Sequence, residues 1–271
     1  MNVFEVARIV AQKKHENRYN IFIKKDGKEH YGFSVEEETI INEGIRKGQI
    51  LDQTTIDALM KKDTLHKAYN RALGYLGHRM RSVKELRTYL IEKEVETEQI
   101  EIIINRLKEQ KILDDQAFAT AYVRTKIKTT FKGPAQLKRE LIQKGIESAQ
   151  IDQALLEYSE TEQIKLIQKW LEKQLKKTKR DSYRLGQMKM KRQLIQKGFN
   201  QSVIDQALQM MELEKDEEKE WQALVFQGEK ALRRYRKKTE GYLLEQKVKA
   251  SLYQKGFNQD QIGRFIEQYL E

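Results

Sequence analysis

One pattern occurs four times along this chain of 271 residues and constrains its fold more than any other feature. In each copy a leucine-bearing stretch ends at a lysine, and a second apolar stretch follows after a constant gap. Aligned on Lys93, Lys144, Lys197 and Lys255, the copies share apolar residues seven and three positions before the lysine and seven and eleven positions after it. In order of position, these residues are Leu86, Leu137, Met190 and Val248; Leu90, Leu141, Leu194 and Leu252; Ile100, Ile151, Ile204 and Ile262; and Ile104, Leu155, Leu208 and Ile266. A period of about fifty residues predicts like units that bury their apolar stripes against one another.

The repeat predicts a mainly α fold of tandem three-helix repeats that form an elongated, curved array. One proline and 14 glycines leave few breaks, which favours long helices. We expect the repeats to cover residues 64–110, 111–160, 161–213 and 214–271. The first helix of each repeat has large apolar or aromatic anchors, which are Tyr69, Leu73, Leu76, Phe118, Tyr122, Trp170, Trp221 and Leu224.

Residues 1–63 have a different pattern. The stretches VARIVAQKK, RYNIFIKK and KEHYGFS are rich in β-branched and aromatic residues, and Asp26-Gly27 between the last two predicts a hairpin turn. We therefore expect a small N-terminal β-hairpin or three-stranded sheet, followed by short connecting helices that begin at Ser34 and Asp52. Because so few strands are marginally stable alone, the sheet should pack on the first helical repeat.

The turn after each repeat lysine has a local explanation. Gly145, Gly198 and Gly256 follow the lysine and suit the left-handed conformation that closes a helix. The leucine three positions before the lysine and the apolar residue after the glycine then form the hydrophobic pair of a Schellman motif. In the first copy Glu94 replaces the glycine, so we expect a less regular turn there.

Charge is divided between the helices of each repeat. The formal net charge of +11 indicates a polyanionic or acidic partner. The four windows that end at the repeat lysines hold 15 basic and 4 acidic residues, whereas the third-helix windows hold 2 basic and 9 acidic ones. A tandem helix-turn-helix reader would place that acidic last helix in the DNA groove, where phosphates would repel it. A basic stripe along the array is better suited to a long acidic or nucleoprotein surface.

Several clusters of cations are candidates for contact with such a partner. Any one lysine can simply be a solvated helix residue, but the clusters together favour binding. The predicted partner- or nucleic-acid-binding residues are Arg79, Arg81, Arg124, Lys126, Lys128, Lys132, Lys138, Arg139, Lys176, Lys177, Lys179, Arg180, Lys191, Arg192, Arg233 and Arg234.

No pattern of residues predicts catalysis. The chain has no GxxxxGK[ST] or GxGxxG motif, no cysteine, and four histidines without zinc-binding spacing. Asp114-Asp115 could be a metal-binding pair, but its position before AFATAYVR favours a helix cap. We therefore expect no enzyme activity, cofactor or metal. Lack of cysteine, of a signal-peptide cleavage site and of a long apolar run predicts a cytoplasmic protein without a membrane partner.

Three segments resemble a known family, the RecX regulatory proteins of bacteria. The resemblance is specific over about residues 64–160, in NRALGYLGHRMRSVKELRTYL, LDDQAFATAYVR and GPAQLKRELIQKGI, and the third repeat continues it. The matching residues are Ala72, Tyr75, Leu76, Arg79, Arg81, Ser82, Glu85, Leu86, Leu90, Leu113, Asp114, Asp115, Phe118, Ala119, Gly133, Leu137, Glu140, Leu141, Lys144, Gly145 and Ile146. The N-terminal segment and the fourth repeat resemble the longer form found in Gram-positive relatives.

This resemblance implies a regulator that acts without catalysis on the RecA recombinase. Members of the family bind the RecA nucleoprotein filament and limit its extension, ATP turnover and strand exchange, which links them to DNA repair, recombination and the SOS response. The expected partners are thus the RecA filament and single- or double-stranded DNA, bound by a monomer. A general, non-sequence-specific DNA-binding protein remains the alternative, and would bind bare DNA with steep salt dependence.

Overall fold

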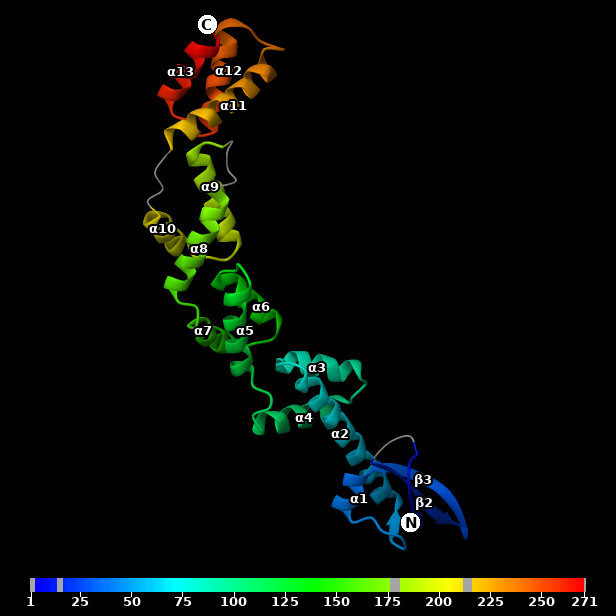
Figure 1. Ribbon diagram of the computed structural model, residues 1–271. Coiled ribbons are helices and arrows are strands. Elements are labelled where there is room, and N and C mark those ends of the chain that lie inside the picture. Colours follow the sequence, from blue (N-terminus) through cyan, green and yellow to red (C-terminus); the bar gives the residue numbers. More distant parts are fainter. Residues whose placement is uncertain (1–2, 14–16, 176–180, 212–215, 271) are drawn as a thin grey trace. The chain divides into compact units, whose positions relative to one another are not determined.

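A computed structural model describes residues 3–13, 17–175, 181–211 and 216–270 (Figure 1). The chain divides into two compact units, Met1–Phe118 and Ala119–Glu271. The fold is mainly α-helical, with three-helix repeats and a small N-terminal antiparallel sheet, as the sequence predicts. Lys176, Lys177, Lys179 and Arg180, which belong to the predicted binding residues, lie outside the described residues.

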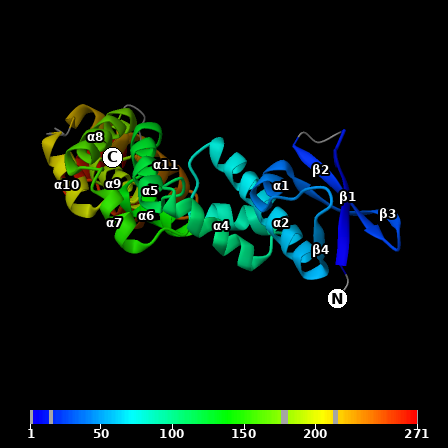
Figure 2. The same ribbon diagram turned by 90° about the horizontal axis from the view of Figure 1, so that it is seen from below.

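The sheet has four antiparallel strands in the order β3-β2-β1-β4. The strands are β1 (Val3–Ala11), β2 (Arg18–Lys25), β3 (Lys28–Glu36) and β4 (Ile50–Asp52). Asp26 and Gly27 have φ angles of 49° and 73°, as a tight hairpin turn requires, so the predicted hairpin is confirmed. Val6, Ile21 and Phe33 point into a core that Ile56 and Leu59 close from the helical side. Figure 2 shows the helices α1 and α2 next to this sheet.

Two details of the N-terminal segment differ from expectation. The three residues of β4 are too short to give a pattern of alternation, and they pair with β1 only because the chain returns after α1 (Glu37–Glu43). Ser34 is not a helix cap: it lies in β3, where its hydroxyl accepts a hydrogen bond from Arg18 (3.0 Å). Glu36 is the N-cap of α1 instead.

A single long helix joins the sheet to the first repeat. α2 (Gln53–Gly77) begins at its N-cap Asp52, whose side chain accepts a hydrogen bond from the Thr55 N–H (2.8 Å). It continues without a break through the expected connecting helix and into the first helix of the repeat. α3 (Val83–Glu92) and α4 (Thr97–Glu109) complete the repeat, and Tyr69, Leu86 and Ile104 are among its buried residues.

The second unit contains further helix triplets (Figure 1). They are α5 (Asp115–Thr129), which begins before the unit boundary, with α6 (Pro134–Gln143) and α7 (Ser148–Leu155); α8 (Glu160–Leu175), α9 (Tyr183–Gln196) and α10 (Gln201–Met210); and α11 (Glu217–Tyr235), α12 (Gly241–Gln254) and α13 (Gln259–Leu270). The four leucines three positions before the repeat lysines are fully buried. In the last apolar column Ile104 and Ile266 are buried, but Leu155 and Leu208 are only half-buried.

The repeat glycines adopt the predicted Schellman turn. Gly145, Gly198 and Gly256 have φ angles of 81°, 89° and 86°. In the third repeat, for example, the Gly198 N–H donates to the Ile195 carbonyl (2.9 Å) and the Phe199 N–H to the Leu194 carbonyl (3.2 Å). The expectation of an irregular first turn is wrong. Glu94 takes φ 60° and the turn forms the same two hydrogen bonds, so the glutamate bears the left-handed strain itself.

Within the second unit these turns also join neighbouring repeats. The Gly133 N–H at the start of α6 donates to the Lys197 carbonyl (2.7 Å), and the Ser182 hydroxyl at the start of α9 donates to the Lys255 carbonyl. A Cβ added to Gly198 would lie 2.5 Å from the Gln136 nitrogen, so this close approach requires glycine. The start of a second helix is thus held against the lysine-glycine turn of the following repeat.

Candidate interaction surface

The basic second helix and the acidic third helix of a repeat are joined by an ion pair at corresponding positions. The cation lies six positions before the repeat lysine, and the carboxylate lies eight positions after it. Lys138 pairs with Asp152 and Lys191 with Asp205, each at 2.7 Å, and Arg87 pairs with Glu101 in the first repeat. Part of the charge separation seen in the sequence is therefore neutralised inside each of the first three repeats.

These pairs lower the pKa values of the carboxylates, as an ion pair with a cation should. A hydrogen bond from Lys138 holds the pKa of Asp152 below its usual range. Hydrogen bonds from Gln201 and then Lys191 do the same to the pKa of Asp205. Lys138 and Lys191, both predicted to contact a partner, are consequently engaged within their own repeats.

The next residue along the second helix behaves differently. Arg139 and Arg192 lie five positions before their repeat lysines, and both are exposed. Neither forms an ion pair with a carboxylate of the described residues, although Arg139 donates to the Ala135 carbonyl (3.3 Å). Two adjacent repeats thus present an available guanidinium at the same position, and the first and fourth repeats have Thr88 and Ala250 there.

Other predicted cations of the second repeat are largely engaged. Arg124 binds both carboxylate oxygens of Glu157, at 2.9 Å each. Lys132 pairs with Glu140, which also accepts a hydrogen bond from the Tyr122 hydroxyl (2.8 Å). Although burial raises the pKa of Glu140, these hydrogen bonds hold it below its usual range.

Lys126 and Lys128 are the remaining predicted cations of the second repeat, and neither forms an ion pair with a carboxylate of the described residues. The Lys126 Nζ lies 5.2 Å from the centre of the Tyr122 ring and near the already paired Glu140. Lys128 is exposed and lines a hollow with Trp170. The second repeat therefore offers less free positive charge than its sequence indicates.

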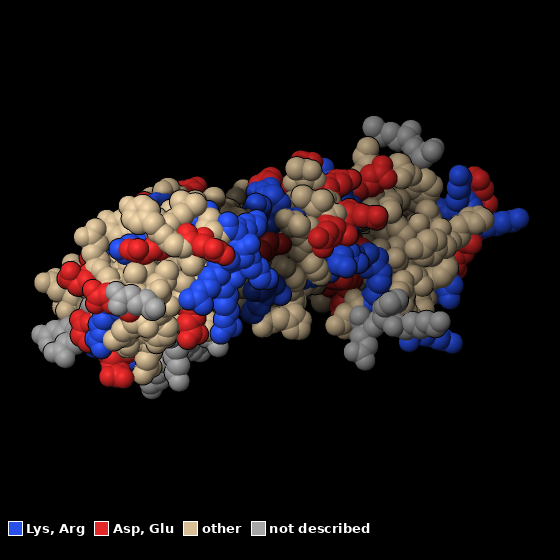
Figure 3. Space-filling view, turned by 90° about the horizontal axis from the view of Figure 1, so that it is seen from above, with Lys and Arg blue, Asp and Glu red and all other residues tan. Residues whose placement is uncertain are grey.

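Cations of the first and fourth repeats complete the predicted set. Arg79 lies 3.5 Å from Glu85, and Arg81 stacks 4.2 Å above the Tyr75 ring. Arg233 is 3.7 Å from Glu229, whereas Arg234 is exposed beside Tyr235. Figure 3 shows one face of the molecule on which Lys and Arg side chains gather in a broad patch with few carboxylates.

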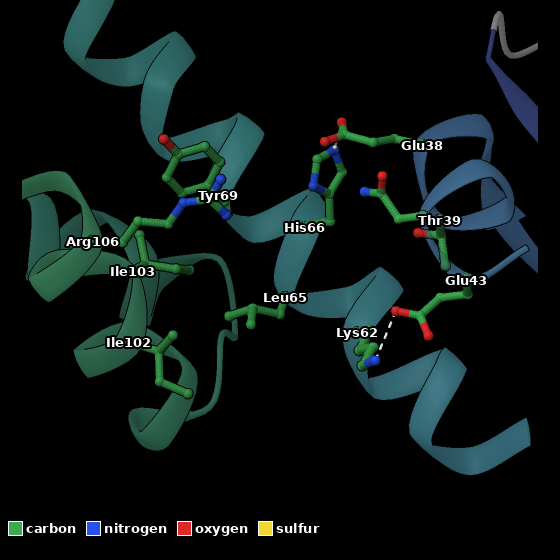
Figure 4. A pocket seen from close by; sticks show the side chains of 11 residues that line it. Glu38, Thr39, Glu43, Lys62, Leu65, His66, Tyr69, Ile102, Ile103 and Arg106 are labelled. Atoms are coloured by element: carbon green, nitrogen blue, oxygen red, sulfur yellow. Dashed lines mark hydrogen bonds and ion pairs between the residues drawn. The ribbon is translucent and has the colours of Figure 1, made fainter. Parts of the chain in front are cut away.

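A hollow of about 180 Å³ in the first unit was not expected from the sequence (Figure 4). α1, α2 and α4 surround it. Its polar side chains contact one another: Lys62 contacts Glu43 (2.7 Å), His66 contacts Glu38 (2.8 Å), and the Arg106 guanidinium lies 4.2 Å from the centre of the Tyr69 ring. The lining residues are scattered over three helices and form no sequence motif. The hollow could therefore not be predicted from the sequence.

Metal binding and membrane insertion are two alternatives to an interaction surface. Across residues 3–13, 17–175, 181–211 and 216–270, no group of three or more histidine or acidic side chains is placed to hold a metal ion. Asp114 caps α5 by accepting a hydrogen bond from the Ala117 N–H (2.9 Å), and Asp115 accepts one from the Val83 N–H (2.9 Å). None of the described helices has the length and apolarity needed to cross a bilayer.

Family models match most of the chain. The model described as "Regulatory protein RecX N-terminal domain" matches residues 5–52. Those for the first and second RecX three-helix domains match residues 68–107 and 114–155. The model for the third three-helix domain matches twice, at residues 160–208 and 217–266. The fourth repeat is therefore a second copy of the third type.

Curated relatives and solved structures agree with these matches. The chain is 44% identical to "Regulatory protein RecX" of Oceanobacillus iheyensis, over 98% of both chains. It is 44% identical to the protein of that name from Halalkalibacterium halodurans, over 96% of this chain and 98% of the relative. A structure titled "Crystal structure of regulatory protein RecX" matches with TM-score 0.67 and 35% identity, over 76% of this chain and 99% of the other. RecX from Lactobacillus salivarius matches with TM-score 0.55 and 35% identity, over 56% of this chain and 99% of the other.

Proposed function

Because the chain belongs to the RecX family of regulatory proteins, we propose that it binds the RecA nucleoprotein filament and restrains its extension, ATP turnover and strand exchange. It does so by binding, without catalysis of its own. In this proposal the protein acts in DNA repair and recombination during the SOS response, and it acts in the cytoplasm. The observation that carries the proposal is the match to regulatory proteins of this family over nearly the whole chain.

Arg139 and Arg192 are the leading contact residues in this proposal. They repeat at one position of neighbouring three-helix units, they are exposed, and carboxylates within the described ranges leave them unpaired. A helical filament also repeats its surface, so identical cations on successive units can meet identical acidic groups on successive subunits. Weak contacts of this kind add through multivalency. Lys138 and Lys191 instead hold their own repeats together.

The test is to add the purified chain to RecA assembled on single-stranded DNA. We expect the RecA ATPase rate to fall, filament growth to stop, and the chain to co-sediment with filaments. An unchanged ATPase rate, combined with tight and strongly salt-dependent binding to bare DNA, would favour the general DNA-binding alternative.

A further inference from the structure

A lysine-lined hollow lies between the end of α5 and the middle of α8. Its volume is about 280 Å³ and it is open to solvent. Lys128, Lys169 and Lys173 line it together with Phe131 and Trp170, and its remaining lining residues are threonine, isoleucine or leucine. No acidic residue is in the lining. In this Trp170 hollow, two aromatic rings lie beside three cations and no carboxylate.

The three lysines are available to a ligand. All three are exposed, and in the described part of the chain none forms an ion pair or a hydrogen bond with another side chain. Lys169 and Lys173 are four residues apart on α8 and so share one face of that helix. Lys128 approaches from α5. The three charges therefore lie beside the aromatic rings, and no carboxylate of the described residues pairs with them, which favours an anionic ligand.

The aromatic side chains form a supported platform. The Phe131 and Trp170 rings stack with centroids 5.4 Å apart and planes at 9°. Phe131 also packs against the buried Phe199 at 5.2 Å, so it is held from behind by the third repeat. Packing between repeats accounts for Phe131. The same packing covers the Trp170 ring face that stacks on Phe131, but it leaves Trp170 half-exposed beside the lysines of the hollow.

We propose that the Trp170 hollow binds single-stranded nucleic acid, with a base stacked on Trp170 and the flanking phosphates held by Lys128, Lys169 and Lys173. Grooves that bind single strands combine these same two elements, aromatic platforms and cations that follow the backbone. A duplex keeps its bases stacked inside and offers Trp170 no free ring face. An acidic peptide would use the lysines but would leave the tryptophan without a partner. Single-stranded DNA is among the partners that the family resemblance implies. The new element is the site, whose contact needs no RecA and so extends beyond the proposed function.

The chain suits a direct fluorescence test because it has only two tryptophans, Trp170 and Trp221. In the Trp221→Phe variant, Trp170 is the sole tryptophan. Adding short single-stranded oligothymidylate should quench its fluorescence in a saturable way. A duplex of equal length should quench it less.

Substitutions separate the two parts of the site. Trp170→Ala should weaken oligothymidylate binding roughly 5- to 150-fold, and Trp170→Phe, which keeps a stacking ring, should weaken it less. Lys128→Ala combined with Lys169→Ala and Lys173→Ala should flatten the plot of log affinity against log salt by roughly 0.7 for each phosphate that the lysines no longer neutralise. Lys165→Ala is the matched control, because Lys165 is an exposed lysine of α8 outside the hollow.

Three outcomes would overturn the proposal. The first is that oligothymidylate causes no quenching. The second is that the Trp170→Ala variant binds oligothymidylate as tightly as the parent protein while its circular dichroism shows intact helices. The third is that a polyglutamate peptide quenches Trp170 as much as oligothymidylate does. The last result would assign the hollow to an acidic protein segment. Because these titrations contain no RecA, their failure leaves the ATPase result untouched, and a failed ATPase assay leaves the titrations untouched.

Discussion

The third and fourth repeats have one fold and two different surfaces. Both match the same family model, and both bury the leucine before their repeat lysine, Leu194 and Leu252. The third repeat has the Lys191–Asp205 pair and an exposed Arg192. In the fourth, Gly263 takes the place of the aspartate and Ala250 that of the arginine, and Lys249 pairs with Glu245 on its own helix (2.5 Å). The apolar columns specify the fold, whereas the charged columns are free to vary with function.

The shared core should respond alike in both repeats, and this gives the largest expected effect. Leu194→Ala and Leu252→Ala should each lower the free energy of unfolding by about 2–5 kcal/mol, because each leaves a cavity in a closed core. Urea denaturation followed by circular dichroism measures this. Ile195→Ala, at an exposed neighbouring residue, is the control and should have little effect. An unfolding transition at the urea concentration of the parent protein, for either leucine variant, would show that the two repeats do not share this buried core position.

The unpaired arginines and the paired lysines of the second and third repeats should respond differently. Neutralisation by Arg139→Gln with Arg192→Gln should weaken binding to the RecA filament by more than about tenfold, since a contact with a charged group contributes about 1.5–3 kcal/mol. Lys138→Gln with Lys191→Gln removes charge from the same helices, but from cations that already have partners. Co-sedimentation with filaments compares the two variants. Equal losses would mean that only total charge matters.

The glycine turns should differ in tolerance. Gly198→Ala should destabilise the protein by about 1–3 kcal/mol, because alanine is strained at φ 89° and its Cβ would meet the Gln136 backbone. Gly256→Ala has similar strain, but its Cβ meets only the side chains of Ser182 and Arg184, at 3.0 and 3.3 Å. We expect a smaller loss for it in thermal unfolding. The reverse order would contradict the contact between α6 and the third-repeat turn.

Restoring an acidic residue in the fourth repeat should have a small stabilising effect. Gly263→Asp places a carboxylate where the other repeats have one, and nothing lies within 4 Å of the added Cβ. Better helix propensity and a new ion pair with Lys249 should together add less than about 1 kcal/mol. Gly263→Asn isolates the propensity part, because asparagine and aspartate have similar helix propensities. Equal melting temperatures for the two variants would mean that Lys249 remains with Glu245.

The smallest expected effect is the change in folding stability at acidic pH. The folded-state pKa values of Asp152 and Asp205 are lowered by their hydrogen-bonded partners, so their stabilisation is present above the unfolded pKa of about 4 and is lost as the pH falls through the folded values. The combined Asp152→Asn and Asp205→Asn variant should therefore be less stable than the parent at neutral pH. The difference should disappear as the pH falls below about 4. Urea midpoints across this range measure it, and a difference that persists in acid would exclude the ion pairs as its source.

The features that could be predicted from sequence are those set by neighbouring residues. Periodic leucines, the Asp26-Gly27 turn and the glycine after each repeat lysine all act within a few residues, where backbone hydrogen bonding fixes the geometry. Glu94 shows the limit of such reasoning. Its residue type indicated an irregular turn, yet the packed repeat holds the glutamate in the left-handed conformation.

The candidate surface was predicted less well because charge alone does not reveal pairing. Lys138 and Arg139 are adjacent and alike in sequence, but only Lys138 faces a carboxylate, fourteen residues further along on another helix. The Trp170 hollow likewise exists because the end of α5 lies beside α8. Both the ion pair and the hollow depend on contacts between two helices, so the sequence of one helix does not predict them.

The amino-acid sequence by itself determined the repeat, its three helices, its glycine-closed turns and its family, since each depends on spacing along one chain. Only the tertiary structure decided which cations are neutralised, which remain exposed, and where Trp170 meets three lysines. The physical reason is that a helix sets which of its own residues share a face, whereas the packing of helices sets what that face meets.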